Sequence, residues 1–150
     1  MRIIETIKSE LDKIPGIKYH TEHDTISVLP AHENGFKVSF VYNGPDDCHI
    51  SGDDWKMSPD YFSNEVEALG IFFGCLSLGY RLKIGTLNGK KCYWEIEQYV
   101  NGKWSADYSH REWASLFLLF SFWRKKEVVK YYQNEFLQQI PDGSIIYSWF

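Results

Sequence analysis

Apolar residues recur at helical spacing at the start of the chain. The repeating positions are Ile3, Ile7, Leu11 and Ile14. This i, i+4, i+8, i+11 spacing places all four on one face of a helix over residues 2–14. The pair Pro15-Gly16 follows, and such a pair ends a helix. The first segment is therefore predicted to be an amphipathic helix.

Alternation of apolar and polar residues then predicts short strands. The predicted strands are Ile17–His20, Thr25–Leu29, Phe36–Tyr42 and Cys48–Ile50. Within the third strand, Phe36, Val38, Phe40 and Tyr42 share one face. Glycine-containing turns at residues 33–35 and 43–46 separate the last three strands. We expect these strands to form an antiparallel sheet.

A second helix is predicted between Ser58 and Gly79. Ser58 is an N-cap residue type and Pro59 suits the first helical position. The predicted buried stripe is Phe62, Val66, Leu69, Phe73 and Leu76. Gly70 and Gly74 stand one turn apart, although glycine inside a helix costs ~0.5–1 kcal/mol relative to alanine. Their spacing predicts that a neighbouring element approaches this helix closely.

Two Asn-Gly pairs divide residues 80–108 into three predicted strands of a β-meander. A three-residue loop, with Gly89 in a bulge, pairs Leu82 with Trp94. The same loop type around Gly102 pairs Trp94 with Tyr108. One face of the meander is then apolar throughout, whereas a two-residue loop at Asn88-Gly89 would mix apolar and charged groups on both faces.

The last third of the chain predicts a C-terminal helix. Ser109-His110-Arg111-Glu112 is a capping-box sequence that precedes a nearly all-apolar run to Trp123. Helical spacing resumes from Val128 to Phe136. A strand over residues 116–123 is the alternative, but this run lacks β-branched residues. Residues 144–150 are expected to be a short extended tail.

Together these elements predict one α+β domain over residues 1–150. Its antiparallel β-sheet ends in a C-terminal β-meander, and N-terminal, central and C-terminal helices cover it. The element order resembles that of small acidic secretion chaperones, in which helices cover a bent antiparallel sheet. This resemblance covers the whole chain in element order alone, so it assigns no functional residue.

Charge and cysteine content narrow the class of function. The net charge of −4 argues against nucleic acid as a partner. The three cysteines, Cys48, Cys75 and Cys92, are widely spaced and fit a reducing cytoplasm. The longest apolar stretch, residues 113–123, is shorter than the roughly 20 residues that span a bilayer. The sequence has no recognised metal-ligand spacing and no phosphate-binding glycine loop, so no cofactor and no metal are predicted.

Four aspartates around a short strand form the predicted binding site, together with an adjacent tryptophan. These residues are Asp46, Asp47, Asp53, Asp54 and Trp55. Carboxylates attract a basic partner and speed its encounter, and an exposed tryptophan anchors it. We therefore expect a non-catalytic protein-binding domain of the adaptor, secretion-chaperone or toxin-immunity type. The aromatic content of 17% is also compatible with a homo-oligomer.

A carboxylate pair supports an alternative, catalytic function. The predicted register places Glu95 opposite Asp107, with Cβ atoms about 5 Å apart. Such a pair can separate its pKa values and act as acid and base in a small hydrolase or carbohydrate-active enzyme. Arg81 falls in the same row, where it could hold a substrate anion. A solvated outer face of the meander would place the same charges there without any catalytic role.

Overall fold

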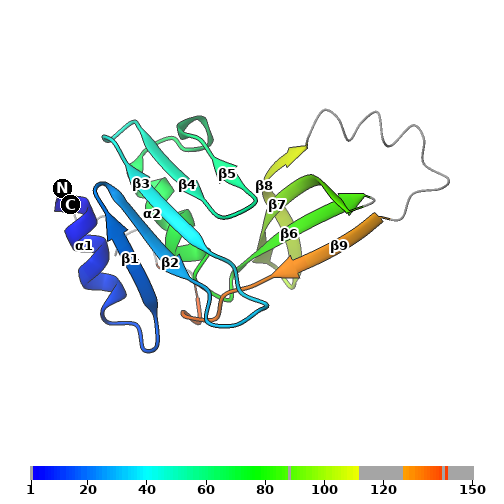
Figure 1. The fold of residues 1–150 in the computed structure, drawn as a ribbon, viewed down its shortest axis with the longest axis horizontal. Coiled ribbons are helices and arrows are strands. Elements are labelled where there is room, and N and C mark those ends of the chain that lie inside the picture. The colour runs from blue at the N-terminus through cyan, green and yellow to red at the C-terminus, as the bar shows by residue number, and fades with distance from the viewer. Residues whose placement is uncertain (1, 88, 112–126, 140, 142–150) are drawn as a thin grey trace.

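In a computed structural model, the chain forms two antiparallel sheets, and its α-helices pack on the first of them (Figure 1). The structure describes residues 2–87, 89–111, 127–139 and 141. The elements in chain order are α1 (Arg2–Leu11), β1 (Lys18–Glu22), β2 (Thr25–Leu29), β3 (Val38–Tyr42), β4 (Cys48–Ser51), β5 (Lys56–Met57), the 3₁₀ turn η1 (Pro59–Tyr61), α2 (Glu65–Gly74), β6 (Tyr80–Leu87), β7 (Lys90–Val100), β8 (Lys103–Arg111) and β9 (Glu127–Tyr132). The fold class is α+β, as the sequence predicts.

The first sheet is a meander in the order β1-β2-β3-β4-β5. Its inner face is largely apolar, and Ile26, Phe40 and Ile50 on it have no exposed surface. The predicted helix α1 covers this sheet with Ile7 and Leu11, which are also fully buried. These elements confirm the period-of-two and helical patterns of the first 50 residues.

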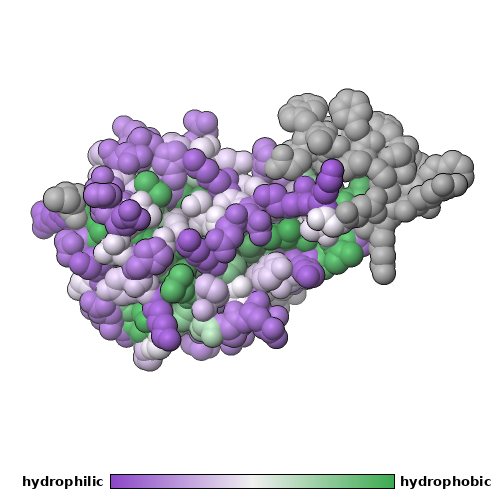
Figure 2. Space-filling view, in the orientation of Figure 1, coloured by the Kyte–Doolittle hydropathy of each residue, from purple (hydrophilic) through white to green (hydrophobic). Residues whose placement is uncertain are grey.

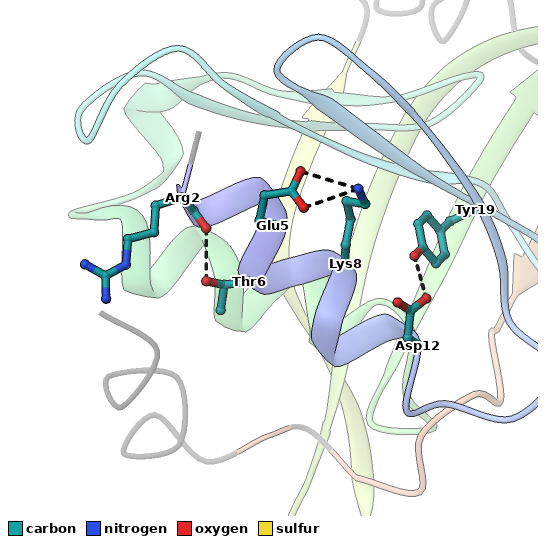
Figure 3. A network of polar contacts seen from close by, with 6 residues as sticks. All are labelled: Arg2, Glu5, Thr6, Lys8, Asp12 and Tyr19. Carbon is teal, nitrogen blue, oxygen red and sulfur yellow. Dashed lines mark hydrogen bonds and ion pairs between the residues drawn. The ribbon is translucent and has the colours of Figure 1, made fainter.

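A polar contact at the surface joins the turn just after α1 to the first strand (Figure 3). The Tyr19 hydroxyl donates to Asp12 Oδ1 at 2.5 Å, and the Lys8 ammonium lies 3.3 Å from Glu5. The hydrogen bond to Asp12 raises the pKa of Tyr19. The Lys8–Glu5 pair lies within α1, so the buried isoleucine face is what docks the helix on the sheet.

The central helix begins later and ends earlier than predicted. Ser58 precedes only the short turn η1, and its side chain makes no capping hydrogen bond. The backbone is extended at Phe62 (φ −120, ψ 140), which interrupts the helical path. Helix α2 then starts with Asn64 as its N-cap, whose side chain accepts from Glu67 N at 2.9 Å. Asn64, six residues after Ser58, therefore caps the helix and sets its start.

The predicted close approach is confirmed at Gly74 and comes from Tyr80 at the start of β6. A Cβ atom on Gly74 would lie 2.2 Å from Cε2 of the Tyr80 ring. That ring is itself buried, so it has little room to move away. Gly74 thus lets the second sheet pack against the end of α2. For Gly70 the close approach stays a prediction.

The second sheet has the order β8-β7-β6-β9, and its predicted core face is confirmed although the predicted register is wrong. Leu82 pairs with Ile96, two positions away from Trp94. Both hairpins have two-residue turns, and a bulge further along each pair supplies the extra residue. The bulges bring the apolar side chains of β6 and β7 back to one face. Gly89 and Gly102 have positive φ, as predicted.

The predicted C-terminal helix is wrong where the structure describes it. Ser109, His110 and Arg111 continue strand β8 and pair with β7. Residues Glu127–Tyr132 form strand β9, which pairs with β6 along its full length. Ladder hydrogen bonds to neighbouring strands therefore outweigh the local capping-box and helical patterns. The remainder of that predicted helix and the predicted tail fall on residues 112–126 and 142–150, which lie outside the described residues.

One hydrophobic cluster contains residues of both sheets. A buried asparagine beside it forms hydrogen bonds with two distant segments of the chain. Asn134, just after β9, is 1% exposed. Its Oδ1 accepts from Phe36 N at 3.1 Å, and its Nδ2 donates to Phe36 O at 2.9 Å and to Cys75 O at 3.0 Å. The segment before β3, the end of α2 and the segment after β9 therefore meet at one side chain.

Candidate functional site

The four predicted aspartates lie at opposite ends of β4. Asp46 and Asp47 belong to the turn before it, and Asp53 and Asp54 to the turn after it. All four are exposed, as predicted. Because β4 has four residues, about 13 Å of strand separates the two pairs. The four aspartates therefore form two separate pairs, and their role in binding stays a prediction.

Lysines offset the charge of the second pair. The ammonium of Lys37 lies 3.9 Å from Asp53 Oδ1, and Lys91 Nζ donates to the backbone oxygen of Asp54. Lys56, two residues further along the chain, is exposed. The turn between β4 and β5 thus has no excess of negative charge to attract a basic partner.

The first pair keeps its acidic surroundings. Burial and the nearby carboxylates of Glu65, Asp47 and Asp46 raise the pKa of the Cys48 thiol to about 11. His49 Nε2 lies 2.8 Å from Asp47 Oδ1. Three carboxylates therefore converge at this end of the first sheet, away from the second sheet (Figure 1).

Trp55 is a core residue, so its predicted role as an exposed anchor is wrong. It is 4% exposed, with its ring 6.0 Å from that of Phe36 and 5.9 Å from that of Trp94. It therefore joins the first sheet to the second. The charged neighbours Asp54 and Lys56 suggest a surface position in the sequence, but Trp55 alternates inward with Met57.

A cavity of about 710 Å³, here called the inter-sheet cleft, lies between the β4–β5 turn and the second sheet. Its lining residues are Ser51, Gly52, Asp53, Asp54, Trp55, Lys56, Ser58, Tyr61, Lys91, Trp94 and His110. The His110 ring stacks on Trp94 with centroids 6.3 Å apart. Two aspartates and two lysines balance one another in this lining, so its charge favours neither a cationic nor an anionic ligand.

The outer face of the second sheet carries a different constellation, here called the Arg81 row: Arg81, Glu97, Tyr99, Trp104 and Tyr131. The Arg81 guanidinium carbon lies 4.4 Å from the Trp104 ring centroid and 4.1 Å from that of Tyr131. Its Nε and Nη2 both lie 2.7 Å from Glu97 Oε2. A carboxylate and two aromatic rings therefore hold the guanidinium.

Strand pairing explains how this row forms. Arg81 of β6 lies opposite Glu97 of β7, and Tyr99 of β7 lies opposite Trp104 of β8. Tyr131 comes from β9 on the other side of β6. Opposite and diagonal neighbours on one face are within reach of long side chains. Tyr99 is 52% and Tyr131 47% exposed, so the row presents aromatic surface to solvent.

Sequence reasoning missed this row. Tyr99 and Trp104 face each other only when Asn101-Gly102 is a two-residue turn, and both residues of that turn do have positive φ. The Asn-Gly pair is the local signal for such a turn. Tyr131 could not be placed from the sequence, because its segment matched a helical pattern.

The predicted pairing of Glu95 with Asp107 is wrong. Glu95 lies opposite Ser109, and its carboxylate is 3.5 Å from the Lys83 ammonium. Asp107 is the extra residue of the β8 bulge, where it accepts a hydrogen bond from the Tyr80 hydroxyl at 3.1 Å. Burial, followed by the charge of Asp107, raises the pKa of Tyr80. The two carboxylates thus have separate structural partners.

No family model, curated protein or solved structure matches this chain. Within the described ranges, no group of three His, Cys, Asp or Glu side chains is arranged to hold a metal ion. In the same part of the chain, no helix has the length and apolar character needed to cross a membrane. The geometry of the sheets is therefore the basis for interpreting function.

Proposed function

We propose that this chain is a non-catalytic protein-binding domain that contacts its partner through the Arg81 row. The observation behind this proposal is the gathering of Arg81, Trp104, Tyr99 and Tyr131 on the outer face of one sheet. Tryptophan, tyrosine and arginine are the residue types that dominate the energetics of protein interfaces. Small-molecule sites are instead concave and enclose their ligand.

The rigidity of the row also supports binding. Arg81 is held by Glu97, which is only 6% exposed, and by two rings. A side chain already fixed in this way loses little conformational freedom when a partner binds. The neighbouring Lys83–Glu95 pair leaves the face close to neutral, so aromatic contact can contribute more than long-range attraction.

Acidic residues at one end of the first sheet favour a basic partner. Asp46, Asp47 and Glu65 form the negative end of the first sheet, which favours encounter with a positively charged protein. An adaptor, a chaperone of a secreted protein or an immunity protein against a toxin would each use such a surface. Cys48, Cys75 and Cys92 are unpaired and buried, which suits the reducing cytoplasm proposed for these roles.

The catalytic alternative receives less support. It depends on two carboxylates facing each other across a cavity, as in glycoside hydrolysis. Glu95 instead pairs with Lys83 on the open sheet face, and Asp107 binds Tyr80. No other observation in the described residues favours a hydrolase.

The test is a comparative affinity capture from the native host with three baits. They are the wild-type chain, Tyr99→Ala and Val100→Ala. Tyr99 and Val100 are neighbouring strand residues that are 52% and 41% exposed, and adjacent strand residues point to opposite faces. Loss of an interface hot spot costs about 2 kcal/mol or more, which weakens the dissociation constant roughly 30-fold.

We expect wild type and Val100→Ala to capture the same protein, with purified components confirming the loss of affinity in Tyr99→Ala. Circular dichroism should show that both variants remain folded. A partner that binds wild type and Tyr99→Ala equally well would refute the Arg81 row as the interface. An enzymatic activity that survives Tyr99→Ala and needs Glu95 would favour the alternative.

A further inference from the structure

The inter-sheet cleft has two walls of different chemistry. The wall on the second sheet is aromatic, with the His110 ring stacked on Trp94 and the Tyr61 ring 6.2 Å from that of Trp94. The opposite wall follows the β4–β5 turn and presents polar groups, among them Ser51 and Asp53. The same division is visible on the face shown in Figure 2, where the first sheet is mostly hydrophilic and hydrophobic residues reach the surface along the second sheet.

Contacts within the chain hold the aromatic wall in place. The Tyr61 hydroxyl is directed at Ser109 O, 3.5 Å away on β8, and the Tyr61 ring lies 6.0 Å from that of Tyr108. Trp94 is only 3% exposed, and its ring also lies 5.9 Å from that of Trp55. Rings that are already fixed in this way lose little conformational freedom when a ligand stacks on them.

The charges of the polar wall are offset within the chain. The Lys37 ammonium lies 3.9 Å from Asp53 Oδ1, and Lys91 Nζ donates to the backbone oxygen of Asp54. An ionised carboxylate only accepts hydrogen bonds, whereas an ammonium group only donates them. A hydroxyl group does both, so it can pair with either kind of side chain in this wall. An ionised ligand would instead meet one group of its own sign beside each group of the opposite sign.

A buried donor without a partner adjoins the same wall. Trp55 is 4% exposed, and its Nε1 has no hydrogen-bond partner in the part of the chain that the structure describes. Gly52, which lines the cleft, lies against this atom so closely that a Cβ at position 52 would collide with it. Buried donors in native proteins are nearly always paired. Because position 52 has no side chain, a ligand oxygen there can reach the donor directly or through one bridging water.

We propose that the inter-sheet cleft binds a neutral mono- or disaccharide. The C–H face of a sugar ring packs against the electron-rich face of an aromatic ring, here Tyr61 and His110. Its hydroxyl edge then meets the β4–β5 wall, where Asp53 and Lys91 accept and donate hydrogen bonds. The cleft volume of about 710 Å³ lies within the ~300–1,000 Å³ of ligand pockets. This site is separate from the Arg81 row, which lies on the outer face of the second sheet.

An NMR titration of the isotope-labelled full chain tests the proposal. The probes are neutral mono- and disaccharides of glucose, galactose, mannose and N-acetylglucosamine. At least one of them should bind saturably and shift the indole N–H signal of Trp55 once the signals of all six tryptophans are assigned. The Trp104 indole is the internal reference, because its ring belongs to the Arg81 row, and its signal should stay in place.

Charged sugars and a planar ligand test the chemistry of the site. The uronate and the amino sugar that correspond to the bound saccharide each replace a neutral group by an ionised one. Both should bind more weakly than the neutral sugar, because each meets a like charge in the wall. Adenosine stacks on aromatic rings but carries fewer hydroxyl groups, so it should also bind more weakly.

Variants of the two walls separate stacking from hydrogen bonding. Tyr61→Leu removes the ring and should weaken saccharide affinity about two- to tenfold, whereas Tyr61→Phe keeps the ring and should bind like wild type. The double variant Asp53→Ala/Asp54→Ala should weaken affinity at least about tenfold. Its matched control is Asp46→Ala/Asp47→Ala, an equally exposed pair at the other end of β4, which should bind like wild type. Circular dichroism checks that each variant is folded.

Four results would overturn the inference. They are no saturable binding by any neutral probe, a shift of the Trp104 signal with the Trp55 signal unchanged, stronger binding of a charged sugar or of adenosine, and wild-type affinity in Asp53→Ala/Asp54→Ala. The proposed function is tested separately, because Tyr99→Ala should bind the saccharide like wild type. Loss of the protein partner in that variant would leave the cleft unaffected.

Discussion

Replacement of Asn134 by alanine should destabilise the fold more than any surface change of similar size. The substitution removes three hydrogen bonds that Asn134 makes with Phe36 N, Phe36 O and Cys75 O. All three contacts are buried, so water cannot readily replace the amide. A net contribution of about 1 kcal/mol for each bond predicts a loss of roughly 3 kcal/mol, and more if a backbone group stays unpaired.

Urea unfolding followed by tryptophan fluorescence measures this loss directly. At about 3 °C per kcal/mol for a chain of this length, the thermal midpoint should fall by roughly 10 °C. Asn34→Ala is the matched control, because Asn34 is exposed and its side chain makes no hydrogen bond within the described residues. The control should change the free energy of unfolding by less than ~0.5 kcal/mol.

A loss below ~1 kcal/mol in Asn134→Ala, similar to that of Asn34→Ala, would refute the reasoning. It would mean that the segment after β9 is not held to Phe36 and Cys75 as the structure has it. A large loss with an unchanged urea dependence would instead match removal of specific bonds from an otherwise intact fold.

Three further predictions concern packing, pH and charge. Gly74→Ala and Gly74→Leu should lower the free energy of unfolding by ~1–3 kcal/mol in urea titrations, because a Cβ atom would collide with the Tyr80 ring and outweigh the better helix propensity. A stabilised Gly74→Ala would contradict the close contact. Hydrogen bonds from Ser63 lower the pKa of Glu67, so its stabilisation is present above the unfolded value of ~4.3 and is lost as pH falls through the lower folded value. Unfolding of Glu67→Gln should accordingly show a deficit at pH 7 that shrinks in acid, and a deficit independent of pH would exclude this linkage. Replacement of Asp46 and Asp47 by asparagine should slow association with the captured basic partner at low salt more than replacement of Asp53 and Asp54 does, measured by stopped flow at two salt concentrations. Equal effects would contradict the offset of the second pair's negative charge by Lys37 and Lys91.

Local patterns were sufficient for the elements that depend on neighbours in the sequence. The isoleucine face of α1 and the alternation in β2 both appear where the sequence predicts them. Gly89 and Gly102 have positive φ because tight turns require that conformation. Glycine adopts it readily because it has no Cβ atom. The core face of β6 and β7 was also predicted, because any register with one apolar face requires the same alternation.

The candidate site depended on contacts between distant segments. The predicted anchor Trp55 became a core residue because two sheets close around it, and the aspartates beside it acquired Lys37 and Lys91 as neighbours. Asn134 was not recognised in the sequence, since its three hydrogen-bond partners lie 59 or 98 residues away along the chain. Contacts between residues far apart in the chain are set by tertiary packing, so they leave no periodic pattern in the sequence.

The sequence by itself determined which segments of the first half are amphipathic, where turns with positive φ occur, and that the fold class is α+β. Only the tertiary structure decided the register of the second sheet, the strand state of β9 and the burial of Trp55. The physical reason is one of range. Helical and alternating patterns report on which face of a segment avoids water. A bulge at Asp107 or the pairing of β9 with β6 is set by hydrogen bonds to a strand elsewhere in the chain, and these outweigh local propensities of a few tenths of a kcal/mol per residue.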